Sequence, residues 1–308
     1  LVARTVGHEG GAGVAEPGVV GGHLDDGHVV VVLEDGLYFP WDADDQIAAK
    51  MAQLTGCVRY RPDDMILEGG SITVDGEGTV IVTDQCLLSP GRTASAVLAE
   101  EEDEETIWPK YAKQFEPWSE ELREYMDEHL KAYLGVEKVI WVREGIDPEE
   151  TNGHIDDVAT FIAPGVVAVI WTDDPDYPFY RQCHEAYDTL AAATDAQGRQ
   201  LKVYKLPMPV EPLYMDQASC DTIDVDENAE PRVADEPLIA SYMNYLVTNG
   251  GVIVPQYGDV NDQLAVDTLQ QIYDEVWGAG AYKCVGVQSE QVVFGGGNIH
   301  CITQQQPR

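Results

Sequence analysis

A recurring order of strands and helices constrains the fold of this chain more than any other feature. Three segments each contain a strand, a turn with glycine and a second strand: Gly69–Asp84, Asp156–Trp171 and Ser241–Gln256. A helical pattern follows each hairpin and leads to a short apolar strand, such as "KVIWV" or "CVGVQ". Units of this kind bury their apolar faces only by packing around a shared centre or along an axis. The sequence therefore predicts an α/β fold built from strand–turn–strand–helix–strand units.

The helices are predicted from apolar spacing and from their end residues. Ser119 is a good N-cap, apolar residues follow it at helical spacing, and Gly135 ends the pattern. Similar patterns occupy Asp44–Thr55, Phe179–Thr194 and Asp262–Trp277.

Two stretches differ from the repeating pattern in this chain of 308 residues. Residues 1–34 are rich in Gly, Val and His without clean periodicity, and residues 93–118 contain the acidic run "AEEEDEET". We therefore predict an atypical N-terminal segment over 1–34 and a repeat domain over 35–308 that carries an acidic insertion at about 93–118.

The charge balance bears on possible partners. The chain has 55 acidic and 18 basic residues, for a net charge of −37. This field repels nucleic acid and anionic membranes and attracts cations. It is explained either by solubility, for instance in a salt-rich cell, or by attraction of a cationic substrate. No apolar run approaches the ~18 residues of a transmembrane helix.

The six cysteines indicate a reducing compartment. They form no CxxC pair, and no Cys/His set has zinc-finger spacing. We predict a cytoplasmic protein in which most of these thiols are buried and inert.

Polar residues stand at the ends of the predicted strands. They are Glu68, His154 to Asp156, and Asn298 to Cys301. Packing of the units around one centre would bring these three groups together.

His154 and Asp156 are two residues apart, so their side chains share a face if this stretch is extended. Such a pair can transfer a proton while holding a cation, or it can ligate a metal, although no third and fourth ligand follow at convincing spacing. The alternative is an ordinary turn before a strand.

Glu68 precedes two glycines, which allow close backbone approach. A carboxylate buried there needs a partner such as a protonated histidine; otherwise this is a tight turn with an exposed Glu.

Cys301 follows the glycine run "GGG" by a few residues, and ordinary core strands avoid such a run. A reactive thiol needs a nearby base or a site that favours the thiolate. His300 is adjacent, but neighbours on a strand point to opposite faces, so His154 is the better candidate. The alternative is a buried structural cysteine.

The combined motifs resemble the agmatine deiminases of the guanidine-modifying, amidinotransferase-like superfamily. The matching stretches are "DGLYFPWDADDQIAAKM", "LEGGSITVDGEGTVIVTDQCLLSPGR", "ETNGHIDDVATFIAPG", "KLPMPVEPLYM", "SYMNYLVTNGGVIVPQYGD" and "GGGNIHCITQQQP". The resemblance implies a five-bladed α/β propeller, the pentein fold, made of ββαβ modules. It also implies hydrolysis of agmatine to N-carbamoylputrescine and ammonia, without cofactor or metal, in a protein that is often a homodimer.

The resemblance also implies a role for each site residue. Cys301 would be the nucleophile, and His154 would give a proton to the departing ammonia and then activate water. Asp156 would hydrogen-bond the guanidinium, and Glu68 would orient His154 and keep it charged. The backbone at the substrate-binding residues Gly296, Gly297 and Asn298 would approach the flat guanidinium closely.

One family motif is missing. The family carries an Arg-Asp-Thr-Gly-Pro stretch whose aspartate also grips the guanidinium, whereas Arg4 and Thr5 adjoin directly here. We therefore expect an incomplete N-terminal blade and the loss of half of the carboxylate clamp. Two alternatives to the agmatine deiminase hypothesis follow: an inactive or truncated member that serves as a non-catalytic binding subunit, and a deiminase of another guanidine, such as peptidyl-arginine or free arginine.

Overall fold

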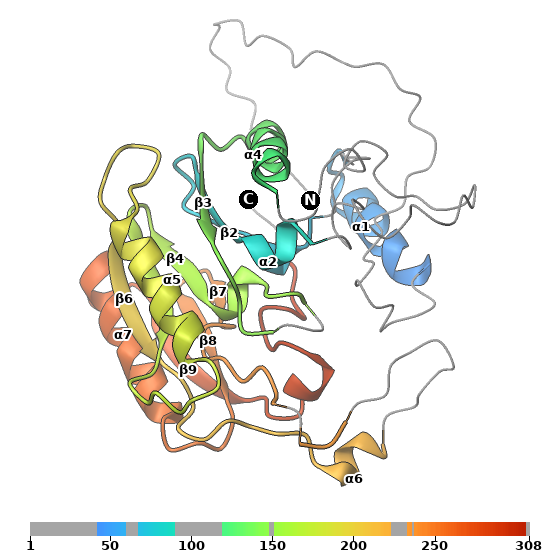
Figure 1. The fold of residues 1–308 in the computed structure, drawn as a ribbon, viewed down its shortest axis with the longest axis vertical. Coiled ribbons are helices and arrows are strands. Elements are labelled where there is room, and N and C mark those ends of the chain that lie inside the picture. Colours follow the sequence, from blue (N-terminus) through green and yellow to red (C-terminus); the bar gives the residue numbers. More distant parts are fainter. Residues whose placement is uncertain are drawn as a thin grey trace, which may run out of the picture.

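The computed structural model describes residues 42–59, 67–89, 119–147, 151–222, 233–235 and 237–305. The predictions for the segment 1–34 and for the insertion at 93–118 lie outside these residues. Within the described residues, the chain forms three similar modules, each with a three-stranded sheet (Figure 1). In every sheet the first two strands are antiparallel and the third strand is parallel to the second.

The elements follow the predicted order within each module. The first module contains β1 (Thr73–Val74), β2 (Thr79–Thr83), the short helix α2 (Asp84–Leu87), α4 (Glu120–Leu134) and β3 (Lys138–Val142). The second contains β4 (Ala159–Ala163), β5 (Val166–Trp171), α5 (Tyr180–Ala192) and β6 (Lys202–Pro207). The third contains β7 (Leu246–Thr248), β8 (Gly251–Gln256), α7 (Asp262–Trp277) and β9 (Lys283–Gln288). Outside this pattern lie α1 (Asp42–Thr55), α6 (Gln217–Cys220) and three 3₁₀ turns: η1 (Gly69–Ser71), η3 (Ile155–Asp157) and η4 (Val293–Gly295).

This arrangement confirms the mixed α/β fold with ββαβ modules. The predicted helix over Asp262–Trp277 has the observed bounds, and α4 begins and ends as its caps indicate. The Ser119 side chain accepts a hydrogen bond from the Leu122 amide, and Gly135 takes the left-handed conformation that ends the helix. Closure into five blades stays a prediction.

Strand β2 is buried on both faces. Val80 and Val82 pack with residues of α4, including Met126, whereas Ile81 belongs to the core shared by the second and third modules. Because successive side chains of a strand point to opposite faces, one strand of five residues joins two apolar clusters.

Neighbouring modules are also joined through their helices and loops. Helix α5 contacts β5 of its own sheet and β3 of the preceding module, and α7 contacts β8 and β9 together with β6 (Figure 1). Two side-chain hydroxyls bridge modules at the loops: Thr83 Oγ1 donates to the Gly153 carbonyl, and Ser241 Oγ donates to the Asp157 carbonyl, both at 2.7 Å. These buried bonds fix the loop at 153–157 between its two neighbours.

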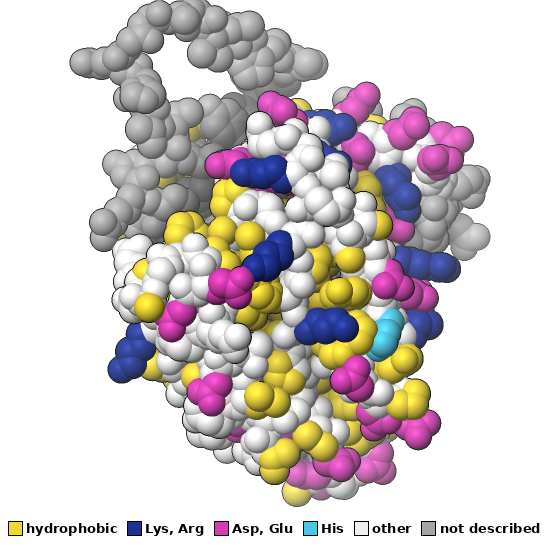
Figure 2. Space-filling view, turned by 90° about the vertical axis from the view of Figure 1, so that its left-hand side faces the viewer, with side chains coloured by type: hydrophobic (Ala, Val, Ile, Leu, Met, Phe, Trp, Pro, Cys, Tyr) yellow, Lys and Arg dark blue, Asp and Glu magenta, His cyan; other side chains and the backbone are white. Residues whose placement is uncertain are grey.

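Acidic side chains are scattered over the face drawn in Figure 2 and do not gather into one patch there. None of the described helices has the length and apolar character needed to cross a lipid bilayer.

Candidate active site

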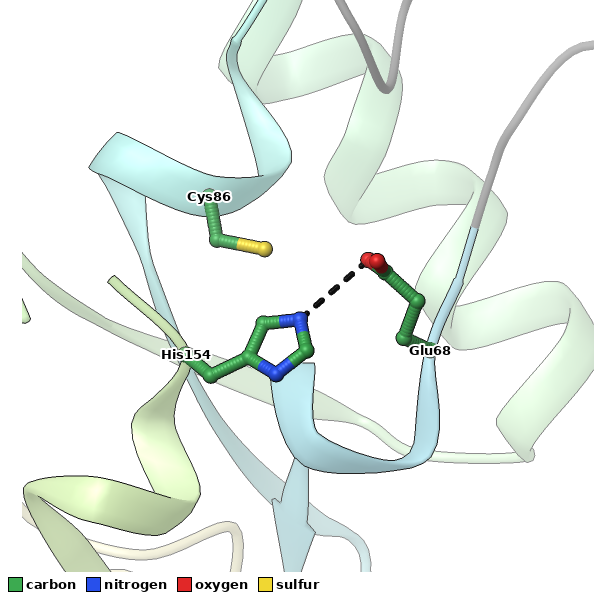
Figure 3. Close-up of side chains that lie close together, drawn as sticks. All are labelled: Glu68, Cys86 and His154. Atoms are coloured by element: carbon green, nitrogen blue, oxygen red, sulfur yellow. Dashed lines mark ion pairs between the residues drawn. The ribbon is translucent and has the colours of Figure 1, made fainter. Parts of the chain in front are cut away.

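The residues before η1 and η3 bring Glu68 and His154 together. His154 Nε2 lies 3.3 Å from Glu68 Oε2, and both side chains are largely buried (Figure 3). Burial lowers the pKa of His154, but the Glu68 carboxylate and the Cys86 thiol oppose this, and the net pKa lies well above the usual histidine value. A buried imidazolium is therefore the favoured resting form.

Gly70 allows His154 and Asp156 to approach the same point of the backbone. A Cβ atom at position 70 would lie 2.5 Å from His154 Nδ1 and 3.0 Å from Asp156 Oδ2. Real side chains do not tolerate the first distance, so only glycine fits here. A Cβ atom at Gly69 would meet nothing within 4 Å, so the second glycine is the one that the site requires.

Asp156 connects the second module with the C-terminal loop. Its Oδ2 lies 2.7 Å from His300 Nδ1, 3.2 Å from Asn244 Nδ2 and 3.4 Å from Cys301 Sγ. Its other oxygen, Oδ1, is buried and accepts no hydrogen bond from the described part of the chain; the same holds for Oδ2 of Asp157. Two buried carboxylates beside a thiol thus keep free acceptor atoms, which are costly unless a donor arrives.

Asn244 organises this loop from the start of the third hairpin. Its side chain is fully buried, and its Oδ1 accepts hydrogen bonds from the amides of Asn298, His300 and Cys301 at 3.1, 2.9 and 3.3 Å. Its Nδ2 donates to Cys301 Sγ and Asp157 Oδ1, both at 3.0 Å. One amide group therefore holds the backbone from Asn298 to Cys301 and also touches the sulfur atom of Cys301.

The thiol of Cys301 is protonated in the resting site. Burial of the sulfur raises its pKa, the carboxylates of Asp156 and Asp157 raise it further, and the Asn244 amide lowers it. Asp157 is affected in the same sense: burial and the neighbouring Asp156 raise its pKa well above the usual value. A cation between these groups would offset the part of both pKa shifts that comes from the neighbouring carboxylates.

The glycines that the sequence predicts to bind substrate, Gly296 and Gly297, lie where the chain turns sharply toward Cys301. Gly296 and Gly297 both have positive φ, and a Cβ atom at Gly297 would overlap Cys301 Sγ. Asn298 is fully buried, and its side-chain Nδ2 donates to Tyr257 Oη and the Ser289 carbonyl. Its Oδ1 is buried and accepts no hydrogen bond from the described residues.

Two local predictions were wrong. His154 and Asp156 do not lie on an extended strand, because residues 155–157 form η3; the two side chains meet at Gly70 for a different reason. Residues 299–302 form a turn and not a strand, so the argument that placed His300 and Cys301 on opposite faces does not hold. His300 contacts Asp156, the same carboxylate that Cys301 contacts.

Asn244, Asp157 and Cys86 were not predicted to be members of the site, and His300 was considered as a base but set aside. Asn244 carried a usable signal, because it occupies the start of the third hairpin as Glu68 and His154 precede the first two. Its neighbours Tyr242, Met243 and Tyr245 are apolar and made the stretch resemble a strand.

Comparisons with known proteins identify the family of the chain. Residues 34–107 and 118–307 match the family of Porphyromonas-type peptidyl-arginine deiminases. A putative agmatine deiminase of Streptococcus mutans is 50% identical over 275 residues, which cover 89% of this chain and 66% of the relative. An agmatine deiminase of Pseudomonas aeruginosa is 42% identical over the same shares of both chains.

A solved agmatine deiminase of Enterococcus faecalis superposes with a TM-score of 0.76 at 48% identity, covering 89% of this chain and 66% of that structure. The chain thus spans about two thirds of the length of these relatives. It belongs to the Porphyromonas-type peptidyl-arginine deiminase family and, within that family, to the agmatine deiminases.

Proposed function

We propose that this protein hydrolyses agmatine to N-carbamoylputrescine and ammonia through a covalent amidino-cysteine intermediate. The observation that carries the proposal is the pair of buried carboxylates, Asp156 and Asp157, beside Cys301. Oδ1 of Asp156 and Oδ2 of Asp157 receive no hydrogen bond from the described residues. The identities of 42% and 50% to proteins named agmatine deiminase support the choice of substrate.

A guanidinium group suits this site for three reasons. It is planar, it is permanently cationic, and it presents N–H donors in a fork that matches carboxylate oxygens. Its positive charge would satisfy both carboxylates and remove the repulsion that raises the pKa of Asp157. Asp156 would therefore bind the guanidinium directly, with Asp157 behind it.

The arrival of the cation would also prepare the nucleophile. The fields of Asp156 and Asp157 keep the Cys301 thiol protonated, and a guanidinium beside them offsets both fields. The thiol then releases its proton to water more easily. The thiolate attacks the guanidinium carbon to form a C–S bond, and the electrons of the C=N bond move onto nitrogen.

His154 would serve as the general acid and then as the general base. Its imidazolium, stabilised by Glu68, gives a proton to the departing amino group, which leaves as ammonia. The neutral imidazole then takes a proton from water, the hydroxide attacks the amidino carbon, and the C–S bond breaks to release the ureido product and restore Cys301. One general acid–base of this kind contributes about 10²–10⁴ in rate.

The test measures ammonia and N-carbamoylputrescine after incubation of the purified chain with agmatine. We expect release of both products from the unchanged protein and none from Cys301→Ser, while Cys183→Ser, which alters a buried thiol of α5, keeps the activity. Absence of both products with the intact chain would refute the proposal. Labelling of Cys301 by a haloacetamidine, followed by mass spectrometry, separates a reactive site from a non-catalytic binding subunit.

The matching family description favours a second candidate, a peptidyl-arginine deiminase. Kinetics with agmatine, free arginine and an arginine peptide distinguish the substrates, and the highest kcat/KM is expected for agmatine. Free arginine carries a carboxylate that needs a cationic partner, and the chain has only 18 Lys and Arg residues.

Cytoplasmic location and a homodimeric state complete the proposal. All six cysteines are free, as expected of a protein in a reducing compartment. Light scattering of the purified protein tests the dimer.

A further inference from the structure

We propose that Glu68, Cys86 and His154 form a binding site for Zn²⁺, and that zinc bound there withdraws His154 from catalysis. The three residues offer a carboxylate oxygen, a thiol sulfur and an imidazole nitrogen, all within 4.8 Å of one another. They come from three separate positions in the chain: the residue before η1, helix α2 and the residue before η3. Figure 3 shows the sulfur atom and the carboxylate on the same side of the imidazole ring.

The donor set fits zinc in type and in charge. Imidazole, thiolate and carboxylate are the ligands that Zn²⁺ takes in proteins, with three protein ligands and one open position at accessible sites. In such a tetrahedron the ligand atoms are about 3.3–3.8 Å apart, since the bonds measure about 2.0–2.3 Å. The three ligand atoms lie within 4.8 Å of one another, so small side-chain movements would bring them to these distances. One carboxylate and one thiolate also neutralise the divalent ion, which limits the cost of burying it.

A second observation points to a ligand at this place. His154 Nε2 is buried and makes no well-formed hydrogen bond within the described residues, although it faces Glu68 at 3.3 Å. The Cys86 side chain is fully buried, yet its sulfur faces this nitrogen (Figure 3). The backbone is held in place on two sides, because Thr83 Oγ1 accepts from the Cys86 amide and Ser71 Oγ donates to the Glu68 carbonyl. The site is thus formed before any ion binds.

Zinc in this position would inhibit the proposed reaction. Zn²⁺ bound to Nε2 would take the place of one of the two ring protons, so His154 could not form the imidazolium that the proposed reaction uses as its acid. The net charge of −37 attracts divalent cations to the molecule as a whole. Cys86 would be the ligand that makes the site selective for a thiophilic ion.

The binding site does not depend on the proposed activity, whereas the inhibition does. We therefore test binding by spectroscopy, with Co²⁺ as a coloured substitute for Zn²⁺ and with Zn²⁺ as its competitor. We expect a thiolate-to-cobalt charge-transfer band in the full chain that Zn²⁺ abolishes. The band should vanish in Cys86→Ser and remain in Cys183→Ser, a matched change at another fully buried thiol.

A neighbouring donor set requires its own control. Asp156, Asp157 and Cys301 also lie within 4.8 Å of one another, so the band must persist in Cys301→Ser. Glu68→Gln keeps the thiolate and should keep the band at saturation while weakening the affinity for Co²⁺ by more than about tenfold. This variant decides the matter if Cys86→Ser does not fold.

The outcomes are clear-cut. The proposed site is refuted if the unchanged protein shows no band, if the band survives Cys86→Ser, or if it is lost in Cys301→Ser. It is also refuted if Glu68→Gln binds Co²⁺ with unchanged affinity. In the activity assay, Zn²⁺ should inhibit the unchanged protein, and a chelator should restore its rate. A chain that binds cobalt but shows no deiminase activity refutes the proposed function and leaves the metal site standing.

Discussion

The change Asn244→Asp tests whether this side chain controls the reactivity of Cys301. Aspartate keeps an oxygen where Oδ1 accepts the amides of Asn298, His300 and Cys301. It replaces the Nδ2 donor, however, by a second oxygen that faces Asp156, Asp157 and the Cys301 sulfur at 3.0–3.2 Å. The variant therefore preserves the loop and reverses the polarity of the contact with the nucleophile.

The size of the effect follows from these contacts. A hydrogen bond to a charged group contributes about 1.5–3 kcal/mol, and its loss destabilises the thiolate by that amount. At 3 Å and an effective dielectric constant of 20, each pair of ionised carboxylates adds about 5 kcal/mol of repulsion, which disfavours a thiolate at the same place further. The lost hydrogen bond alone predicts a decrease of about ten- to a hundredfold in thiolate reactivity and in kcat/KM.

The assay is the rate of alkylation of Cys301 by iodoacetamide as a function of pH, followed by mass spectrometry. Asn261→Asp is the control, because the Asn261 side chain donates to the Met208 carbonyl, away from the site. An alkylation rate and kcat/KM equal to those of the unchanged protein would show that Asn244 has only a structural role.

Three further predictions concern the acid side of the site and the core. Gly70→Ala should lower kcat/KM by at least about tenfold with little change in Tm, because the new Cβ would displace His154. Gly69→Ala is the control and should retain the rate, since its Cβ meets nothing within 4 Å. Equal rates for both variants would contradict this reasoning. Glu68→Gln should shift the alkaline limb of kcat/KM to lower pH, because its carboxylate raises the pKa of His154; an unmoved limb in the pH profile would exclude that role. Folding raises the pKa of His154, so the protonated histidine stabilises the folded state fully below its pKa in the unfolded chain, about 6.5, and this stability is lost as pH rises through its pKa in the folded protein. The Tm of Glu68→Gln should therefore fall most at low pH. Met126→Ala should lower the free energy of unfolding by about 2–5 kcal/mol in urea titrations, since the side chain is fully buried, and a loss below 1 kcal/mol would contradict the packing described here.

Much of the fold was predictable because the spacing of apolar residues indicates strands and helices. The hairpins, the four long helices and the caps of α4 depend on residues close in sequence, and the structure has them where the pattern indicates. The number of blades was not predictable in this way, since it depends on contacts between modules.

The site was harder to predict because its backbone is irregular. The turns at 155–157 and 299–302 take their shape from distant partners, such as the Asn244 amide and the Thr83 hydroxyl, and not from local propensity. Rules about the faces of a strand therefore paired the right residues in one case, His154 with Asp156, and dismissed His300 in the other. The catalytic roles given to the thiol, the histidine and the carboxylates rest on the chemistry of these residue types and stay predictions.

The double burial of β2 has a consequence for the motions of the molecule. A strand that belongs to two apolar clusters loses both when it opens, so the amide hydrogens of Val80, Ile81 and Val82 should exchange with solvent only when the whole chain unfolds. Helix α2 follows this strand without a break and carries Cys86 beside His154. The surroundings of the proposed acid are thus anchored to a strand that we expect to exchange slowly, while Cys301 lies on the turn at 299–302 and is held there by the Asn244 side chain.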